Sequence, residues 1–192
     1  SSQSRGLGDV YKRQPEAIHK VRLWMKQIDT FQQYTGPITY GIAVRKLQMD
    51  KSEEEKEADL QSIPDPVKRQ ARKETMEKGI EAPIVMNSLK KAGEFLDQLE
   101  ANIEDSGWIA GDKFSMADAC TLPYILRLDH LALSEAFSKE KRPKINNWYK
   151  EVRDLDFFDK AVTSQIPPPL VEMMNTFGEE VKEKALNLME EK

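Results

Sequence analysis

Asp118 is the first residue whose type and spacing could carry chemistry, because it follows Ser115 by three positions in GDKFSMADAC (111–120). A carboxylate here could be a general acid, a metal ligand or a helix cap. General acid–base chemistry would need a second carboxylate or a histidine at useful spacing, and Asp118 has neither. The Ser-x-x-Asp pattern instead predicts a capping box, in which the serine oxygen and the carboxylate each accept a backbone N–H. We interpret Ser115 and Asp118 as a structural N-cap.

The remaining residues able to act as nucleophiles or ligands give no site. Cys120 lies in a densely apolar segment with neither histidine near it in sequence, so we expect a buried small hydrophobic residue and not a reactive thiol. His19 and His130 have no further ligands at metal spacing, so we predict no metal site. A single cysteine also excludes an intramolecular disulfide and fits a reducing compartment.

Composition limits the classes of partner. The chain has 192 residues, of which 39% are hydrophobic and 32% charged, and this balance is typical of a helix-rich globular protein. The net charge of −4 gives no indication of nucleic-acid binding. No apolar run approaches the roughly 18–20 residues of a membrane span, and no signal-peptide pattern begins the chain. We therefore expect a cytoplasmic protein that has neither nucleic acid nor a membrane as partner.

The first fourteen residues, SSQSRGLGDVYKRQ, differ from the rest of the chain because they show no helical period. RGLGDVYKRQ resembles the translated read-through of a sequencing adaptor. We interpret residues 1–14 as a non-native or disordered tail, which implies that the natural protein extends upstream; a native flexible tail is the alternative.

From Pro15 onward apolar residues recur at helical spacing in most segments. Gly36-Pro37 is predicted to interrupt the first helix, and residues 38–44 are predicted to resume it after a kink, although their composition also suits a short strand. Further helices are expected from Ser52 with its capping partner Glu55, from Asp65 to Gly79, from Pro83 to Ile103, and from Arg142-Pro143.

The segment after Ser115 is apolar on nearly every face, so we expect a helix buried at the centre of the molecule. Residues 167–169 are three prolines that we interpret as a connector to a charged, exposed helix beginning near Gly178. No convincing sheet is present, and the predicted architecture is all-α. We divide it into a helical domain at 15–165 and an extension at 166–192.

Two motifs then carry a family resemblance. GWIAGDKFSMADA followed by RPKINNWYKEVRDLDFFDKAV resembles the C-terminal helical domain of the glutathione transferase superfamily, where W-x-A-G-D-x-F-S-x-A-D-A leads into a buried helix and R-P-x-x-x-x-W-Y follows. The resemblance covers residues 15–165. The region before residue 84 looks most like bacterial members, including those near the lignin β-aryl-etherases.

The resemblance implies a division of labour between two domains. Catalysis would reside in an N-terminal thioredoxin-like domain, which binds the co-substrate glutathione and supplies a Ser, Tyr or Cys that activates its thiol. No βαβ pattern precedes residue 15, so that domain is missing and we assign no catalytic residue. The helical domain would supply the wall of the electrophile pocket and much of a homodimer interface, in an enzyme of detoxification type.

Three positions on the first long helix are candidate substrate contacts. Tyr34, Thr35 and Tyr40 flank the expected kink, and a kink lined by aromatic residues can widen a pocket; ordinary packing is the alternative. By resemblance, Asp29 lies near the glutathione amino group. The alternative for Asp29 is a solvated edge where it pairs with Lys26.

Two functional hypotheses follow. The first is a glutathione transferase-like enzyme, of which this chain is the inactive electrophile-pocket and dimerisation domain, acting on a small electrophile by conjugation or ether cleavage. The second is a non-catalytic protein-interaction module of the same fold. A free-standing helical bundle unrelated to transferases is a third reading.

Overall fold

The computed structural model describes the backbone of residues 3–191 and the side chains of residues 15–191. Within residues 3–191 every regular element is a helix, which confirms the all-α prediction. In chain order the elements are α1 (Gln3–Thr39), the π-helix η1 (Tyr40–Val44), α2 (Arg45–Met49), α3 (Glu53–Gln61), α4 (Pro66–Lys78), η2 (Gly79–Glu81), α5 (Pro83–Asn102), α6 (Met116–His130), η3 (Ser134–Phe137), α7 (Pro143–Arg153), α8 (Phe158–Ala161), η4 (Thr163–Gln165), α9 (Pro168–Glu179) and α10 (Lys182–Glu190).

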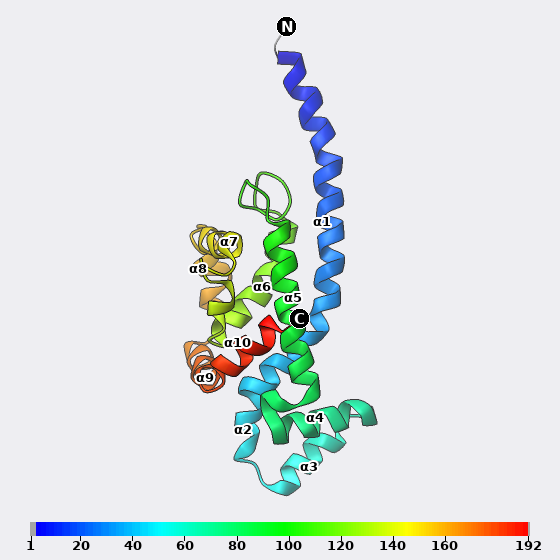
Figure 1. Ribbon diagram of the computed structural model, residues 1–192, viewed down its shortest axis with the longest axis vertical. Coiled ribbons are helices and arrows are strands. Elements are labelled where there is room, and N and C mark those ends of the chain that lie inside the picture. Colours follow the sequence, from blue (N-terminus) through cyan, green and yellow to red (C-terminus); the bar gives the residue numbers. More distant parts are fainter. Residues whose placement is uncertain (1–2, 192) are drawn as a thin grey trace.

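Helices α1 and α5 run side by side and form the spine of the bundle (Figure 1). The apolar stripe of α1 faces α5, where the rings of Phe31 and Phe95 stack with centroids 4.2 Å apart. Trp24 stacks on the same Phe95 ring at 5.7 Å. Such stacked aromatic contacts add to the free energy gained from burying the rings, and they hold α1 against α5.

Helix α1 begins earlier than the sequence predicts. Its residues 3–14 continue the helix that we expected to start at Pro15, and they project beyond the bundle in Figure 1. Extending an existing helix fixes one residue per hydrogen bond, whereas starting one fixes several, so a packed helix readily propagates into neighbouring residues. The assignment of residues 1–14 as non-native remains a prediction about their origin.

The predicted interruption at Gly36-Pro37 takes a different form. Helix α1 passes through Pro37 to Thr39 and then widens into the π-helix η1, so residues 38–44 are helical as predicted. Pro37 has no N–H to donate to the carbonyl of Gln33, which loosens the helix at this point. A π-turn inserts one extra residue per turn and often marks a functional segment.

The helices α3 and α4 begin at the predicted caps and form the outlying hairpin at one end of the molecule (Figure 1). Ser52 and Glu55 form a capping box, with Ser52 N donating to Glu55 Oε2 at 2.8 Å. Asp65 accepts from the N–H groups of Val67 and Lys68. Helix α4 ends at Gly79, whose φ of 59° lies in the left-handed region that favours glycine.

Asp118 is fully buried and joins three parts of the fold. Its Oδ2 accepts from the N–H and the hydroxyl of Ser115, both at 2.8 Å. The bond from the Ser115 N–H is the one that the predicted capping box requires of the carboxylate. Its Oδ1 accepts from Trp148 Nε1 of α7 at 2.9 Å and from Ile109 N of the preceding loop at 3.1 Å. The carboxylate therefore fixes the start of α6 against both the loop and α7.

Helix α6 is not buried on every side, which corrects the prediction of a fully enclosed helix. One flank carries Ala117, Thr121 and Ile125 in the core, whereas Met116 remains 63% exposed and Pro123 is also exposed. Cys120 lies between the flanks and is half-buried, not fully buried as predicted. The apolar sequence indicates burial, but the helices of residues 3–191 cover only one side of α6.

The C-terminal segment packs into the bundle and is not an exposed helix, which is a second correction. Pro168 begins α9, so the proline run ends in a helix, and α10 lies on α5. A Cβ added at Gly93 of α5 would lie 1.8 Å from Met189 O, so the two backbones touch directly. The charged residues of α10 point outward, and its opposite face packs on the core. The residues of this buried face are Ala185, Leu186, Leu188 and Met189.

Candidate functional site

A pocket of about 800 Å³ opens where the end of α1 meets η1, α4, α5 and α6. This volume is within the range of small-molecule sites. The lining residues come from five elements and are Gln32, Thr35, Gly36, Pro37, Thr39, Tyr40, Val44, Val67, Lys68, Ala71, Arg72, Thr75, Ile84, Pro123, Tyr124 and Arg127.

The first wall is the last turn of α1 together with η1. Thr39 donates its hydroxyl hydrogen to Thr35 O at 2.9 Å, and Thr35 donates to Gln32 O at 2.8 Å. These bonds occupy the hydroxyl hydrogens but leave lone pairs on both oxygens as acceptors. The wider π-turn then carries Tyr40 into the pocket wall.

The second wall is α4, which presents Lys68, Ala71, Arg72 and Thr75 at helical spacing. The Arg72 guanidinium lies over the Tyr40 ring, with its central carbon 3.7 Å from the ring centroid. This cation–π contact joins α4 to η1 across the pocket.

The third wall is α6, which supplies Pro123, Tyr124 and Arg127 from the partly open flank of the helix. The Tyr124 ring packs edge-on against Phe31 at 5.6 Å. Burial raises the pKa of Tyr124, and the nearby charge of Asp29 raises it further, so the phenol remains a protonated donor at neutral pH. Burial also lowers the pKa of the Arg127 guanidinium, whose Nη1 donates to Met174 Sδ at 2.7 Å.

The predicted site residues separate into two groups. Thr35 and Tyr40 line the pocket, whereas Tyr34 does not: its ring lies 6.3 Å from Phe31, and it packs against the hydrophobic core. Asp29 is exposed and outside the lining, although its charge acts on Tyr124.

Arg72, Tyr124 and Arg127 were not identified from the sequence. Tyr124 and Arg127 are three residues apart and so share a face of α6, but the pattern alone does not show which face opens onto a cavity. The contact between Arg72 and Tyr40 joins residues 32 positions apart and has no local signature.

A second pocket of about 600 Å³ lies between α6, α7, α8 and α9. At its edge Tyr149 donates to Asp129 Oδ2 at 2.8 Å, and burial raises the pKa of Tyr149. Burial and the charge of Arg127 together lower the pKa of His130.

Two absences apply to the described part of the chain. It contains no group of three or more His, Cys, Asp or Glu side chains placed to hold a metal ion. None of its helices combines the length and the apolar character that crossing a bilayer requires.

The family model for the glutathione S-transferase C-terminal domain matches residues 45–156, which is more than half of the chain. The chain belongs to this family. Comparisons with curated proteins and with solved structures found no match. Within this glutathione S-transferase C-terminal domain the matched range contains the Asp118 cap and the α4 and α6 walls of the pocket, whereas Thr35 and Tyr40 lie before it.

Proposed function

We propose that this chain is the electrophile-pocket and dimerisation domain of a glutathione transferase-like enzyme, which conjugates glutathione to a small electrophile or cleaves an ether by thiol attack. The supporting observation is the 800 Å³ pocket lined by Thr35 and Tyr40 together with Pro123 and Tyr124. Its aromatic and aliphatic walls suit an apolar organic body, and its few polar groups suit orientation of that body.

The thiol chemistry belongs to a separate N-terminal thioredoxin-like domain in this proposal. That domain binds most of the glutathione and supplies the Ser, Cys or Tyr that favours the thiolate, which is the nucleophile. This chain contributes no catalytic residue and alone is inactive. Glutathione chemistry and the free Cys120 both fit a reducing cytoplasmic setting.

The experiment begins with the DNA upstream of the Pro15 codon, read from an independent clone, and with expression of the complete protein that it encodes. Turnover of chlorodinitrobenzene with glutathione is expected from the complete protein and not from residues 15–192. Tyr40→Ala should raise the KM for the electrophile about tenfold and leave the KM for glutathione unchanged, because Tyr40 lines the pocket.

Tyr34→Ala is the matched control, since Tyr34 lies on the same helical stretch but packs on the core. Equal effects of the two variants on the electrophile KM would contradict the pocket assignment. A complete protein that lacks turnover and co-purifies with a stable protein partner would favour the non-catalytic module instead.

Asp29 is assigned a position near the glutathione amino group in the same proposal. Its exposed carboxylate on α1 would attract the ammonium of glutathione, so Asp29→Asn in the complete enzyme should raise the glutathione KM several-fold. Gln33→Ala, one turn further along the exposed edge, is the control. An unchanged glutathione KM in Asp29→Asn would refute this role.

A further inference from the structure

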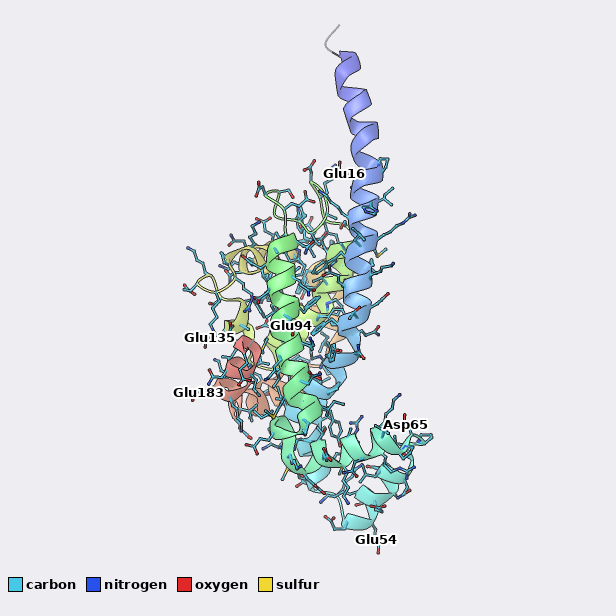
Figure 2. The ribbon with its side chains drawn as sticks, turned by 45° about the vertical axis from the view of Figure 1, so that its right-hand side comes forward. Glu16, Glu54, Asp65, Glu94, Glu135 and Glu183 are labelled. Atoms are coloured by element: carbon cyan, nitrogen blue, oxygen red, sulfur yellow. The ribbon has the colours of Figure 1, made fainter. Side chains whose placement is uncertain are left out.

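The charges around the 800 Å³ pocket are opposite to those of the molecule as a whole. The chain carries a net charge of −4, yet the charged residues that line the pocket are Lys68, Arg72 and Arg127, with no Asp or Glu among the lining residues. The acidic side chains labelled in Figure 2 are all exposed and spread from α1 to α10. The three cations therefore have no acidic neighbour among the residues that line the pocket.

Arg127 is the most constrained of the three cations. It is half-buried in α6, and its one side-chain hydrogen bond within the described residues is to the sulfur of Met174. A thioether is a weak acceptor, and Arg127 is in none of the ion pairs of the described residues. A partly desolvated guanidinium of this kind is stabilised when an anion supplies the missing acceptors.

Arg72 presents its donors to the same space. Its guanidinium carbon lies 3.7 Å from the centroid of the Tyr40 ring, and this contact holds the group on the pocket wall. A guanidinium carries five N–H donors, and those of Arg72 form no hydrogen bond with another described residue, so they are available for a planar anion. Arg72 is likewise in none of the ion pairs of the described residues.

The remaining lining residues indicate what kind of molecule this anionic group would belong to. The Tyr40 and Tyr124 rings lie with Pro37, Ile84 and Pro123 around one cavity, and such surfaces favour a flat apolar group. The nearby carboxylate that acts on a lining residue is Asp29, whose charge is felt at Tyr124. An anionic substituent is therefore favoured toward Arg72 and Arg127 and disfavoured toward Asp29.

From these contacts we infer that the pocket selects an aromatic electrophile bearing a carboxylate, with Arg127 and Arg72 binding the anion and the tyrosine rings binding the aromatic body. This inference rests on the proposed function, because it names the substrate class of the same pocket. Arg127 and Arg72 are specificity-determining residues in this account and take no part in the bond-forming step.

The test uses the 192-residue chain and two probes of one shape, dinitrobenzoate and its neutral analogue dinitrobenzamide. Isothermal titration should show that the carboxylate probe binds at least tenfold more tightly, and that this preference shrinks as salt is raised, because salt screens charges in a pocket that is open to solvent. Arg127→Gln should reduce the preference to about twofold while the amide still binds. Arg127→Lys keeps the charge but loses the pair of parallel N–H donors that a guanidinium offers a carboxylate, so it should retain part of the preference for the carboxylate probe.

Arg72→Gln provides a second variant should Arg127→Gln fail to fold, and it should also reduce the preference for the carboxylate. Arg153→Gln, which removes one exposed cation on α7 away from the pocket, is the control and should leave the preference intact. Equal binding of both probes to the unmodified chain would overturn the anion inference and leave the proposed function standing. A preference that survives in both Arg127→Gln and Arg72→Gln would also overturn the inference, whereas no binding of either probe would overturn both proposals.

Discussion

Asp118 shows how a single carboxylate can be structural without being catalytic. It accepts hydrogen bonds from Ser115, Ile109 and Trp148 while fully buried, so its two oxygens satisfy backbone and side-chain donors from three segments. The local part of this arrangement, the cap with Ser115, follows from the Ser-x-x-Asp spacing. The bond from Trp148 crosses 30 positions and requires the tertiary fold.

Removing the Asp118 carboxylate is the most severe single change that we predict. Asp118→Ala would leave several buried donors unpaired and should lower the free energy of unfolding by about 3–5 kcal/mol. Ser115→Ala removes one capping oxygen and should cost only about 1 kcal/mol. Urea unfolding followed by circular dichroism measures both. Similar losses in the two variants would contradict the role of Asp118 as a junction between segments.

His130 gives the chain a pH dependence near neutrality. Burial and the charge of Arg127 lower the pKa of His130 below 6.5, with Asp129 acting in the opposite direction. The unfolded chain therefore binds this proton more readily than the folded chain, and stability falls as pH drops below about 6.5. His130→Gln should flatten the fall in unfolding free energy between pH 7.5 and pH 5.5.

The unmodified chain provides the control for this measurement. Its unfolding free energy should fall more steeply between pH 7.5 and pH 5.5 than that of His130→Gln, because only the unmodified chain contains the half-buried imidazole. Imidazole titration by NMR gives an independent measure, and a His130 pKa at or above 6.5 would contradict this account.

Of the three residues predicted to contact substrate, Thr35 and Tyr40 line the pocket, whereas Tyr34 packs on the core. All three flank the proline, and position along a helix does not decide which side chains face a cavity until the neighbouring helices are placed. Nothing in the local sequence distinguishes Arg72 and Arg127 from other arginines. Their proposed role depends on the contact of Arg72 with the Tyr40 ring and on the absence of acidic residues from the pocket lining.

Helix caps were predictable and helix exposure was not. Ser52, Asp65 and Gly79 mark element ends by local hydrogen bonding and backbone conformation, so a short window of sequence contains the information. Helix α10 has as many charged residues as a solvent-exposed helix would have, but its apolar residues share one face and pack on α5. The number of charged residues alone therefore does not distinguish a packed helix from an exposed one.

The contact between α5 and α10 depends on a glycine. Gly93→Ala would place a methyl group against the Met189 carbonyl, so α10 must shift, and we expect a loss of about 1–3 kcal/mol in unfolding free energy. Gly36→Ala is the control: apart from its chain neighbours and the backbone of its own helix, nothing lies within 4 Å of the added Cβ, so the change should cost less than Gly93→Ala even though Pro37 follows it. Thermal unfolding that ranks the two variants in the opposite order would refute this packing of α10.

At the scale of the whole molecule, apolar side chains remain uncovered along α1 and α6. Ile18 and Leu23 are 52% and 51% exposed, and Met116 is 63% exposed. Exposed apolar groups of this size favour association, which fits the proposed homodimer and the proposed neighbouring domain. Sedimentation velocity over a range of concentrations should show a dimer or larger species, and a monodisperse monomer at high concentration would contradict this expectation.

The pocket between α1, η1, α4 and α6 is the proposed binding site for an aromatic electrophile. Site-resolved NMR titration of the 192-residue chain with dinitrobenzamide tests it directly. We expect the largest amide shift changes within residues 32–44, 67–75 and 123–127, the segments that line the pocket. Shift changes confined to the second pocket between α6 and α9, or no saturable change, would contradict it.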